Sequence, residues 1–374
     1  MKGLAPLAAS LAGGAALFAA VGVPAPGAPL PSVPPGFRIE IFAAGLGAPR
    51  TLAVDASGTL VTSISAEGRI VALPDRRGRG AADDVVTVAR NLQLPHGLAF
   101  HRGSLYVAET GRVLRFRWDP VALIAREPVV VVDGLPAGAH HWTRTIAFGP
   151  DGRLYVAIGS SCEICREADA RRAAIVRYDA DGSRERVVAR GLRNPVGLAF
   201  DPTTGAPWTT VNERDWRAGD APPDFVTSIT EGANYGWPDC YAQGGLVRKD
   251  PQFRGDDDCG GVTTPTLELP PHSAPLGLVF YAGGPFPAAP GALFVALHGS
   301  RAGLPRAGYR IARVTATTGR PAAIDDFSVW WHRDAGVIGR PVDLVVGRDG
   351  ALYVSDDHAG RIYRTVFVGN SPRS

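Results

Sequence analysis

The hydrophobic positions of this chain fall in short runs that are joined by tight turns. One kind of run follows a turn that contains glycine, as in Gly103–Val107 and Asp349–Val354. A second kind precedes each such turn, as in Pro95–Phe100 and Pro195–Phe200. Two runs on either side of a tight turn predict a β-hairpin. The pairs of runs lie within residues 49–61, 95–107, 143–156, 195–208, 275–295 and 341–354.

The spacing of these hairpins predicts the fold. Successive turn glycines are separated by about 45 to 60 residues, with one longer interval between Gly205 and Gly291, and this period matches a four-stranded blade. Six such blades close a ring without open edges, whereas a β-sandwich would not repeat one paired signature six times. We therefore predict an all-β, six-bladed β-propeller of four-stranded blades over residues 35–368. The long interval predicts a loop insertion around blades four and five.

The composition and the N-terminus indicate an exported globular chain. Hydrophobic residues make up 45% and charged residues 20%, as in ordinary globular proteins. The net charge is only +3 without a run of Lys or Arg, so we expect no nucleic-acid partner. Residues 1–28 combine Lys2, an apolar stretch and small residues, which is typical of a secretory signal peptide. An uncleaved membrane anchor is the alternative. We expect a periplasmic or secreted protein, on a membrane only if this segment stays uncleaved.

The four cysteines fit an oxidising compartment. Four cysteines allow three pairings, and sequence proximity favours Cys162 with Cys165 and Cys240 with Cys259. Arg166 stands where heme attachment would need histidine, and no second close pair completes a zinc ribbon. A structural disulfide in a loop is the preferred interpretation of the CxxC pair.

One register of the repeat is rich in basic groups. In a propeller the first strand of each blade lines the central channel, so the residues just before it surround one mouth of that channel. A ring of cations there suits an anionic ligand. Ordinary surface arginines are the alternative, because the chain contains 39 Lys plus Arg. The residues in this register are Arg50, His96, His141 with Arg144, Arg193 with Asn194, and Arg340.

An acidic loop follows the fourth hairpin. Residues 212–215 and 219–224 carry the four carboxylates of Glu213, Asp215, Asp220 and Asp224 among glycine and proline. Such an oxygen-rich loop suits a hard cation such as Ca²⁺, although it lacks the ligand spacing of an EF-hand. A solvated acidic loop is the alternative.

Several motifs carry a family resemblance. The chain resembles the soluble quinoprotein sugar dehydrogenases of the glucose/sorbosone dehydrogenase group, which use pyrroloquinoline quinone (PQQ). That family has a six-bladed propeller fold, and Ser161-Cys162 and Cys240-Tyr241 are similar to its sorbosone branch. The motifs appear in the family's order over nearly the whole chain after residue 28. They are residues 139–144, 146–152, 191–195 (GLRNP), 212–215 (NERD), 232–238 (GANYGWP), 298–300 and 339–343.

The resemblance implies a chemistry. His141 matches the family's general base, which takes the proton of the substrate hydroxyl while hydride passes to PQQ. Arg193 and Asn194 match the pair that hydrogen-bonds the quinone oxygens, and Arg193 joins His141 as a candidate catalytic residue. The substrate would be a sugar, a sugar aldehyde or a related alcohol, and an external acceptor would receive the electrons. The other residues that this comparison assigns to the cofactor are Glu213, Arg214, Trp237, Arg301 and Arg340.

The acidic loop gains a role from the same resemblance. It is similar to the family's Ca²⁺-binding region, where the ion orients and polarises PQQ. The candidate metal ligands are Glu213, Arg214, Asp215, Asp220 and Asp224.

Three positions depart from the family pattern. Gly303 stands where relatives have a cation, with Arg301 and Arg306 nearby, and Val342 replaces a second arginine. Ser160 replaces an acid that supports the catalytic histidine in the glucose branch, which predicts a base without its usual orienting partner. Two other functions stay open. One is a non-catalytic ligand-binding propeller with a decayed PQQ site, and the other is a Ca²⁺-dependent lactonase or esterase.

Overall fold

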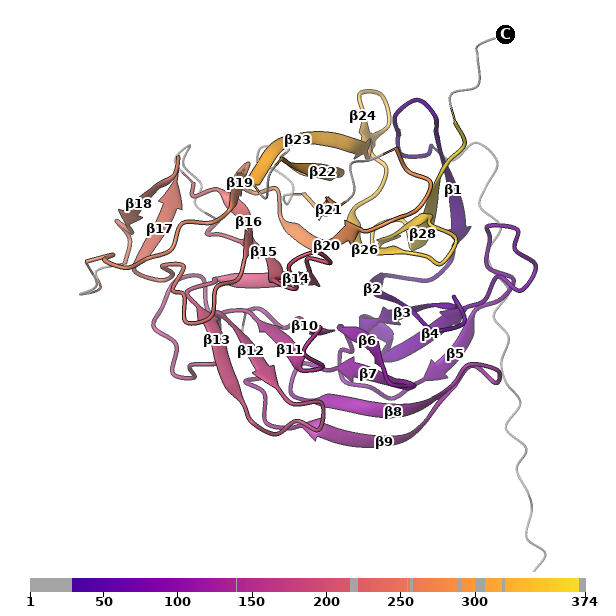
Figure 1. Ribbon diagram of the computed structural model, residues 1–374, viewed down its shortest axis with the longest axis horizontal. Helices are drawn as coiled ribbons and strands as arrows, with labels where there is room; N and C mark the ends of the chain where they lie inside the picture. The colour runs from indigo at the N-terminus through magenta and orange to yellow at the C-terminus, as the bar shows by residue number, and fades with distance from the viewer. Residues whose placement is uncertain are drawn as a thin grey trace, which may run out of the picture.

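The computed structural model describes residues 29–369, except 139, 216–220, 254, 256–257, 288–290, 300–306 and 318–319. The described residues form six four-stranded antiparallel sheets around a common centre (Figure 1). The predicted six-bladed β-propeller is therefore confirmed. The predicted signal peptide, Asp220, Arg301 and Gly303 lie outside the described residues. Within these ranges we find no helix with the length and hydropathy to span a bilayer.

Each predicted hairpin forms the inner two strands of a blade. Blade one contains β2 (Pro49–Val54), β3 (Leu60–Ile64), β4 (Arg69–Leu73) and β5 (Val86–Ala89). Blade two contains β6 (Leu98–His101), β7 (Ser104–Ala108), β8 (Val113–Asp119) and β9 (Ile124–Val132). Blade three contains β10 (Arg144–Phe148), β11 (Leu154–Ile158), β12 (Ala174–Tyr178) and β13 (Arg186–Arg190).

The second half of the ring repeats this order, except that blade four contains an insertion and blade six takes its outer strand from the N-terminus. Blade four contains β14 (Asn194–Phe200), β15 (Pro207–Asn212), β16 (Asp224–Ser228) and β19 (Leu267–Leu269). Blade five contains β20 (Pro275–Tyr281), β21 (Ala292–Leu297), β22 (Arg310–Thr317) and β23 (Arg320–Val329). Blade six contains β26 (Pro341–Val346), β27 (Leu352–Asp356), β28 (Arg361–Phe367) and β1 (Phe37–Ala43).

The ring is closed by the two ends of the domain. Strand β1 pairs with β28 in a register that runs from Phe37 opposite Phe367 to Ala43 opposite Ile362. The ring of Phe37 makes edge contacts with Phe286, Phe327 and Phe367, so the closure also has an apolar core. Pairing the N-terminal strand with the last blade leaves no open gap between the first and last blades of the ring.

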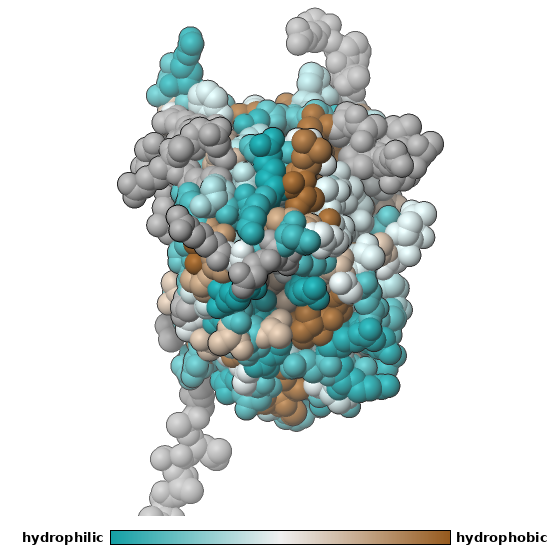
Figure 2. Space-filling model, turned by 90° about the vertical axis from the view of Figure 1, so that its left-hand side faces the viewer, coloured by the Kyte–Doolittle hydropathy of each residue, from teal (hydrophilic) through white to brown (hydrophobic). Residues whose placement is uncertain are grey.

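The insertion lies within blade four. Between β16 and β19 the chain forms a separate hairpin of β17 (Cys240–Gln243) and β18 (Leu246–Lys249). The Cys240–Cys259 disulfide ties this hairpin to the segment that follows it. The side of the molecule that carries the hairpin has a largely hydrophilic surface with separate hydrophobic areas (Figure 2). A smaller hairpin, β24 (Trp331–His332) with β25 (Gly336–Val337), precedes blade six.

The first strands of the blades approach one another closely at the centre. A Cβ atom on Gly197 would lie 2.2 Å from the carbonyl oxygen of Leu276, so only glycine fits there. Val196, Leu276 and Val342 form a small buried apolar cluster between these strands. This contact explains the glycine in the repeated motif and places Val342 in the packed centre of the channel, where it is 3% exposed.

Candidate active site

The segments that precede the first strands meet around a cavity of about 450 Å³ at one mouth of the channel. Several residues of the predicted basic register line it, together with groups from the loops between the second and third strands. The lining includes Arg50, His140, His141, Arg193, Asn194, Asn212, Asp215, His298 and Arg340. The register therefore brings side chains from separate blades to one place, as the sequence predicts.

Two members of that register do not line the cavity. His96 is buried beside the channel, and burial lowers its pKa to about 3. The guanidinium of Arg144 is buried and donates hydrogen bonds to the carbonyls of Pro136, His141 and Thr143. The predicted ring of cations is thus incomplete on blades two and three, because these two side chains support the loops instead.

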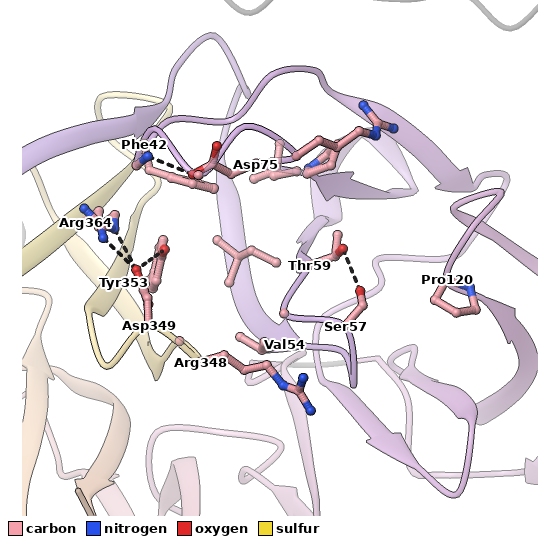
Figure 3. A pocket seen from close by; sticks show the side chains of 18 of the residues that line it. Phe42, Val54, Ser57, Thr59, Asp75, Pro120, Arg348, Asp349, Tyr353 and Arg364 are labelled. Carbon is pink, nitrogen blue, oxygen red and sulfur yellow. Dashed lines mark hydrogen bonds and ion pairs between the residues drawn. The ribbon is translucent and has the colours of Figure 1, made fainter. Parts of the chain in front are cut away.

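A slightly larger hollow lies at the opposite end of the inner strands. It has a volume of about 480 Å³ and is lined by the turns around Gly58 and Asp349. Its polar groups bind one another: Arg364 pairs with Asp349 at 2.7 Å, and Tyr353 donates to the same carboxylate (Figure 3). The site predicted from the sequence lies at the other mouth.

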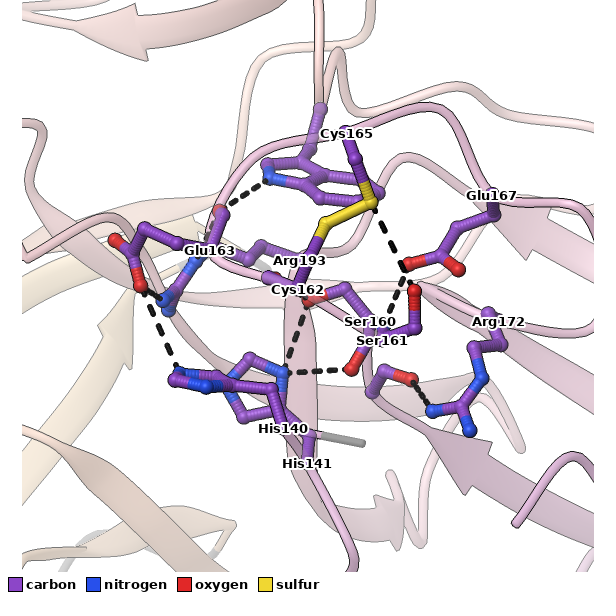
Figure 4. Close-up of a disulfide and its surroundings, with 12 residues drawn as sticks. His140, His141, Ser160, Ser161, Cys162, Glu163, Cys165, Glu167, Arg172 and Arg193 are labelled. Atoms are coloured by element: carbon purple, nitrogen blue, oxygen red, sulfur yellow. Dashed lines mark hydrogen bonds and ion pairs between the residues drawn. A yellow bond between two sulfur atoms is a disulfide. The ribbon is translucent and has the colours of Figure 1, made fainter. Parts of the chain in front are cut away.

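The imidazole of His141 is held in one tautomer. Its Nδ1 lies 2.9 Å from Oγ and 3.1 Å from the carbonyl oxygen of Ser160 (Figure 4). A carbonyl can only accept, and the Ser160 hydroxyl donates its own proton to the carbonyl of Cys162 at 2.7 Å. Nδ1 therefore carries the ring proton, and Nε2 keeps a lone pair.

The surroundings of His141 also keep it neutral. Burial, followed by the charges of Arg193 and His140, lowers the pKa of His141 to about 3. A neutral imidazole with a free lone pair can accept a proton from a hydroxyl group that binds in the cavity. The usual acidic partner is absent at Ser160, as the sequence indicates, and two oxygens of Ser160 contact Nδ1 instead.

Arg193 is a buried cation beside His141. Its guanidinium is 2% exposed. Nε donates to the carbonyl of Glu163 at 3.2 Å, and Nη1 donates to the carbonyls of Asn212 and Glu213. Nη2 forms an ion pair with the Glu163 carboxylate. The neighbouring Asn194 has a buried Oδ1 that no described group satisfies.

Arg340 supplies a second positive charge to the cavity. It donates to the carbonyls of His298 and Gly299 at 3.3 and 2.6 Å and lies over the ring of Tyr309. None of the carboxylates in the described part of the chain forms an ion pair with its side chain. Its charge is therefore left for an anionic ligand.

Arg50 and His298 share one carboxylate at the same cavity. Asp357 accepts from Arg50 at 2.5 Å and from His298 Nε2 at 2.9 Å. Burial would raise the pKa of Asp357, but the hydrogen bond from His298 and the charge of Arg50 lower it to about 2. Nothing in the local motif of Asp357 indicates a partner on another blade, so its role is not visible in the sequence.

Comparison with known proteins decides the family. The family model described as TrAA12-like matches residues 31–366. This chain belongs to the TrAA12-like family.

Relatives of this TrAA12-like chain include fungal enzymes. It is 28% identical over 416 residues to a pyrroloquinoline quinone-dependent pyranose dehydrogenase of Coprinopsis cinerea, covering 91% of this chain and 56% of that protein. It is 26% identical over 326 residues to a pyrroloquinoline quinone-dependent sugar dehydrogenase of Hypocrea jecorina, covering 73% of this chain and 74% of that protein. The holo form of the PQQ domain of pyranose dehydrogenase from Coprinopsis cinerea has a TM-score of 0.76 at 25% identity, with coverage of 91% and 98%.

Two of the proposed cofactor residues lie away from the cavity of the TrAA12-like chain. Arg214 is fully buried and pairs with Glu213 at 2.6 Å and with Asp250 at 2.5 Å. Trp237 is also buried, with its Nε1 3.3 Å from the carbonyl of Glu163. Neither side chain lines the cavity, and the contact of each with a cofactor stays a prediction.

The acidic loop does not gather its carboxylates at one point. Asp224 accepts from the backbone of Glu213 and Ala274, and burial raises its pKa to about 7. Asp215 is exposed at the rim of the cavity. Within the described ranges, three ligand atoms from His, Cys, Asp or Glu side chains come together only at Cys162, Cys165 and Glu167, where the cysteines form a disulfide. The Ca²⁺ site in this loop stays a prediction.

The residues of the cavity fit PQQ, which is a flat quinone with three carboxylates. Arg340 offers an unneutralised cation, while Arg193, Asn194 and His141 form the opposing wall. The unsatisfied Oδ1 of Asn194 marks a polar site that still lacks a partner. The replacement at Val342 removes no group from the cavity wall, since this side chain is packed in the channel.

Proposed function

We propose that this chain is an exported PQQ-dependent oxidoreductase that oxidises a hydroxyl group of a sugar, a sugar aldehyde or a related alcohol. The observation that carries the proposal is a neutral His141, fixed by Ser160, in one cavity with Arg193 and Arg340. The similarity to fungal PQQ-dependent sugar dehydrogenases supports it.

Each residue has a defined task in this proposal. Nε2 of His141 accepts the proton of the substrate hydroxyl, while Nδ1–H stays bonded to Ser160. PQQ, when bound, supplies the two-electron acceptor. Arg193 and the amide of Asn194 donate hydrogen bonds to oxygens that become more negative as the substrate is oxidised. Arg340 pairs with a cofactor carboxylate through its planar guanidinium.

The basicity of His141 depends on what the cavity holds. A pKa of about 3 makes the imidazole a weaker base than an ordinary histidine. A polyanion near Arg193 and His141 would raise this pKa, because negative charge favours the imidazolium form. Proton transfer to Nε2 is therefore more favourable when the anionic cofactor is in place.

We further propose that Ca²⁺ binds beside the cofactor at the loop from Asn212 to Asp224. The electrons then pass to an external acceptor. Within the family, we propose that the chain falls in the sorbosone branch. Export to the periplasm or outside the cell is supported by the two disulfides, which persist in oxidising compartments. A Ca²⁺-dependent lactonase has less support, because the channel centre is occupied by Val196, Leu276 and Val342.

The test measures cofactor binding and turnover separately. Purified protein is titrated with PQQ and Ca²⁺, followed by intrinsic fluorescence, and then assayed for dye reduction with aldoses, sugar aldehydes and polyols. His141→Asn is expected to lose activity by about 10²- to 10⁴-fold and to keep PQQ binding. His332→Asn, on β24, is the control. Full activity of His141→Asn, or no PQQ binding at micromolar concentration, overturns the proposal.

A further inference from the structure

The Cys162–Cys165 disulfide closes a very short loop between β11 and β12. Its two cysteines are three residues apart, whereas Cys240 and Cys259 are nineteen residues apart. A disulfide stabilises a fold mainly by restricting the unfolded chain, and this effect grows with the length of the closed loop. Stability alone therefore gives a weak reason for the Cys162–Cys165 bond.

The closed loop contacts Arg193 directly and His141 through the neighbouring Ser160. On one side, the Ser160 hydroxyl donates to the carbonyl of Cys162 and thereby presents its lone pairs to Nδ1 of His141. On the other side, the carboxylate of Glu163 pairs with Arg193, and the Glu163 carbonyl accepts from Nε of the same arginine. Figure 4 shows the disulfide together with both sets of contacts.

Glu163 is the only acid in the described part of the chain that pairs with Arg193. The guanidinium is almost fully buried, and a buried charge without a partner is strongly unfavourable. Glu163 itself keeps 41% of its side chain exposed, and its second oxygen accepts from the backbone N–H of Asp215 at 2.7 Å. The backbone N–H of Asp215 and the short disulfide loop together keep this exposed acid over the arginine.

We infer that the Cys162–Cys165 disulfide positions His141 and Arg193 through Ser160 and Glu163, so that opening this bond disables the site while the propeller stays folded. Glu163 is the positioning residue for Arg193, and Ser160 is the positioning residue for His141. The inference rests on the proposed function for its effect on turnover, but its effect on the histidine is a property of the protein alone.

The test compares two double variants, Cys162→Ser/Cys165→Ser and Cys240→Ser/Cys259→Ser. The first readout is the Nδ1–H resonance of His141 in ¹H–¹⁵N spectra of protein prepared without PQQ. We expect the first variant to lose this resonance and the second to keep it. We also expect the melting temperature to fall less in the first variant than in the second, because its loop is shorter.

A second pair of variants separates positioning from folding. Glu163→Gln removes the charge that faces Arg193, whereas Glu231→Gln removes an acid of similar exposure that pairs with Arg177 and Arg186 on the outer strands. Loss of one charge-assisted bond predicts that kcat of Glu163→Gln falls about tenfold or more with KM for the sugar little changed. Glu231→Gln is expected to leave both constants unchanged.

The outcomes distinguish the two proposals. If wild-type protein binds no PQQ but the Nδ1–H resonance responds to loss of Cys162–Cys165, the proposed function fails and the positioning inference holds. The inference is wrong if the Nδ1–H resonance persists in Cys162→Ser/Cys165→Ser and if Glu163→Gln has the same kcat as Glu231→Gln. The disulfide then has only a structural role.

Discussion

Nδ1 of His141 lies 2.9 Å from Oγ of Ser160, and the Ser160 hydroxyl donates its proton to the carbonyl of Cys162. This arrangement gives a neutral residue the orienting task that an acid performs in the glucose branch. Serine carries no charge, so it fixes the tautomer through hydrogen bonds alone; the contact with the Ser160 backbone raises the pKa of His141, but burial and the charge of Arg193 outweigh it.

Ser160→Ala tests this relationship. The variant keeps the Ser160 carbonyl, 3.1 Å from Nδ1, and loses the hydroxyl. Losing one hydrogen bond of about 1 kcal/mol predicts a fall in kcat of roughly five- to tenfold, with PQQ affinity unchanged. Ser183→Ala, in an exposed turn, is the control for steady-state dye reduction. Equal kcat values for the two variants would contradict the proposed orienting role.

The buried histidines predict a loss of stability in acid. The folded-state pKa values of His96 and His141 are about 3, below the ordinary value of 6.5, so the unfolded chain binds more protons between these limits. Stability therefore falls as the pH drops from about 6.5 towards 3, by up to about 1.4 kcal/mol per pH unit for each histidine.

Urea unfolding at several pH values measures this dependence. His141→Asn removes one of the two groups, so the slope of unfolding free energy against pH is expected to become shallower than in the wild type. Equal slopes in the two proteins would show that the pKa of His141 is the same in the folded and the unfolded state. Asp224, whose pKa burial raises to about 7, contributes in the opposite sense, and its stabilisation is lost as the pH rises towards 7.

Arg340→Ala is expected to weaken PQQ binding. The residue has no described carboxylate as a partner, so its charge is available to the ligand. Losing one charge-assisted interaction of about 1.5–3 kcal/mol raises the dissociation constant roughly 10- to 150-fold. Fluorescence titration with PQQ gives the measurement. Arg310→Ala, which breaks a surface ion pair with Asp326, serves as control, and similar affinities of the two variants would argue against this role.

Gly159→Ala is expected to displace the side chains of His141 and Asn194. A Cβ atom there would lie 2.5 Å from Oδ1 of Asn194 and 2.6 Å from Cβ of His141. Forcing this contact costs about 1–3 kcal/mol and moves one or both side chains. The melting temperature and kcat of the variant should both be lower than in the wild type. Gly283→Ala, where a Cβ would meet nothing within 4 Å, is the matched control.

Removing Ca²⁺ tests the acidic loop. Chelation followed by dialysis is expected to lower PQQ affinity, and Ca²⁺ should restore it better than Mg²⁺, since a flexible loop of oxygen ligands favours the larger ion. The measurement is a PQQ titration of the chelated, the Ca²⁺-loaded and the Mg²⁺-loaded protein. Identical affinities in all three samples would rule out a role for the ion in cofactor binding.

The sequence alone predicted the fold and the place of the candidate site. The repeated pair of runs determined six blades, because each blade contributes one such pair at the start of its four strands. Since every blade places the start of its first strand at the same mouth, the register also predicted that His141, Arg193 and Arg340 come together.

Other features depended on contacts between distant parts of the chain. Glu163 lies 30 residues from Arg193, and neither its type nor its local motif shows that a short disulfide loop brings the two together. Arg214 and Trp237 lie in family motifs, yet neither lines the cavity, and their partners are the Glu213 carboxylate and the Glu163 carbonyl. Sequence patterns report local backbone geometry and period, so they determined the blades and the mouth. The partner of each buried charge is decided by packing across blades, and only the tertiary structure contains that information.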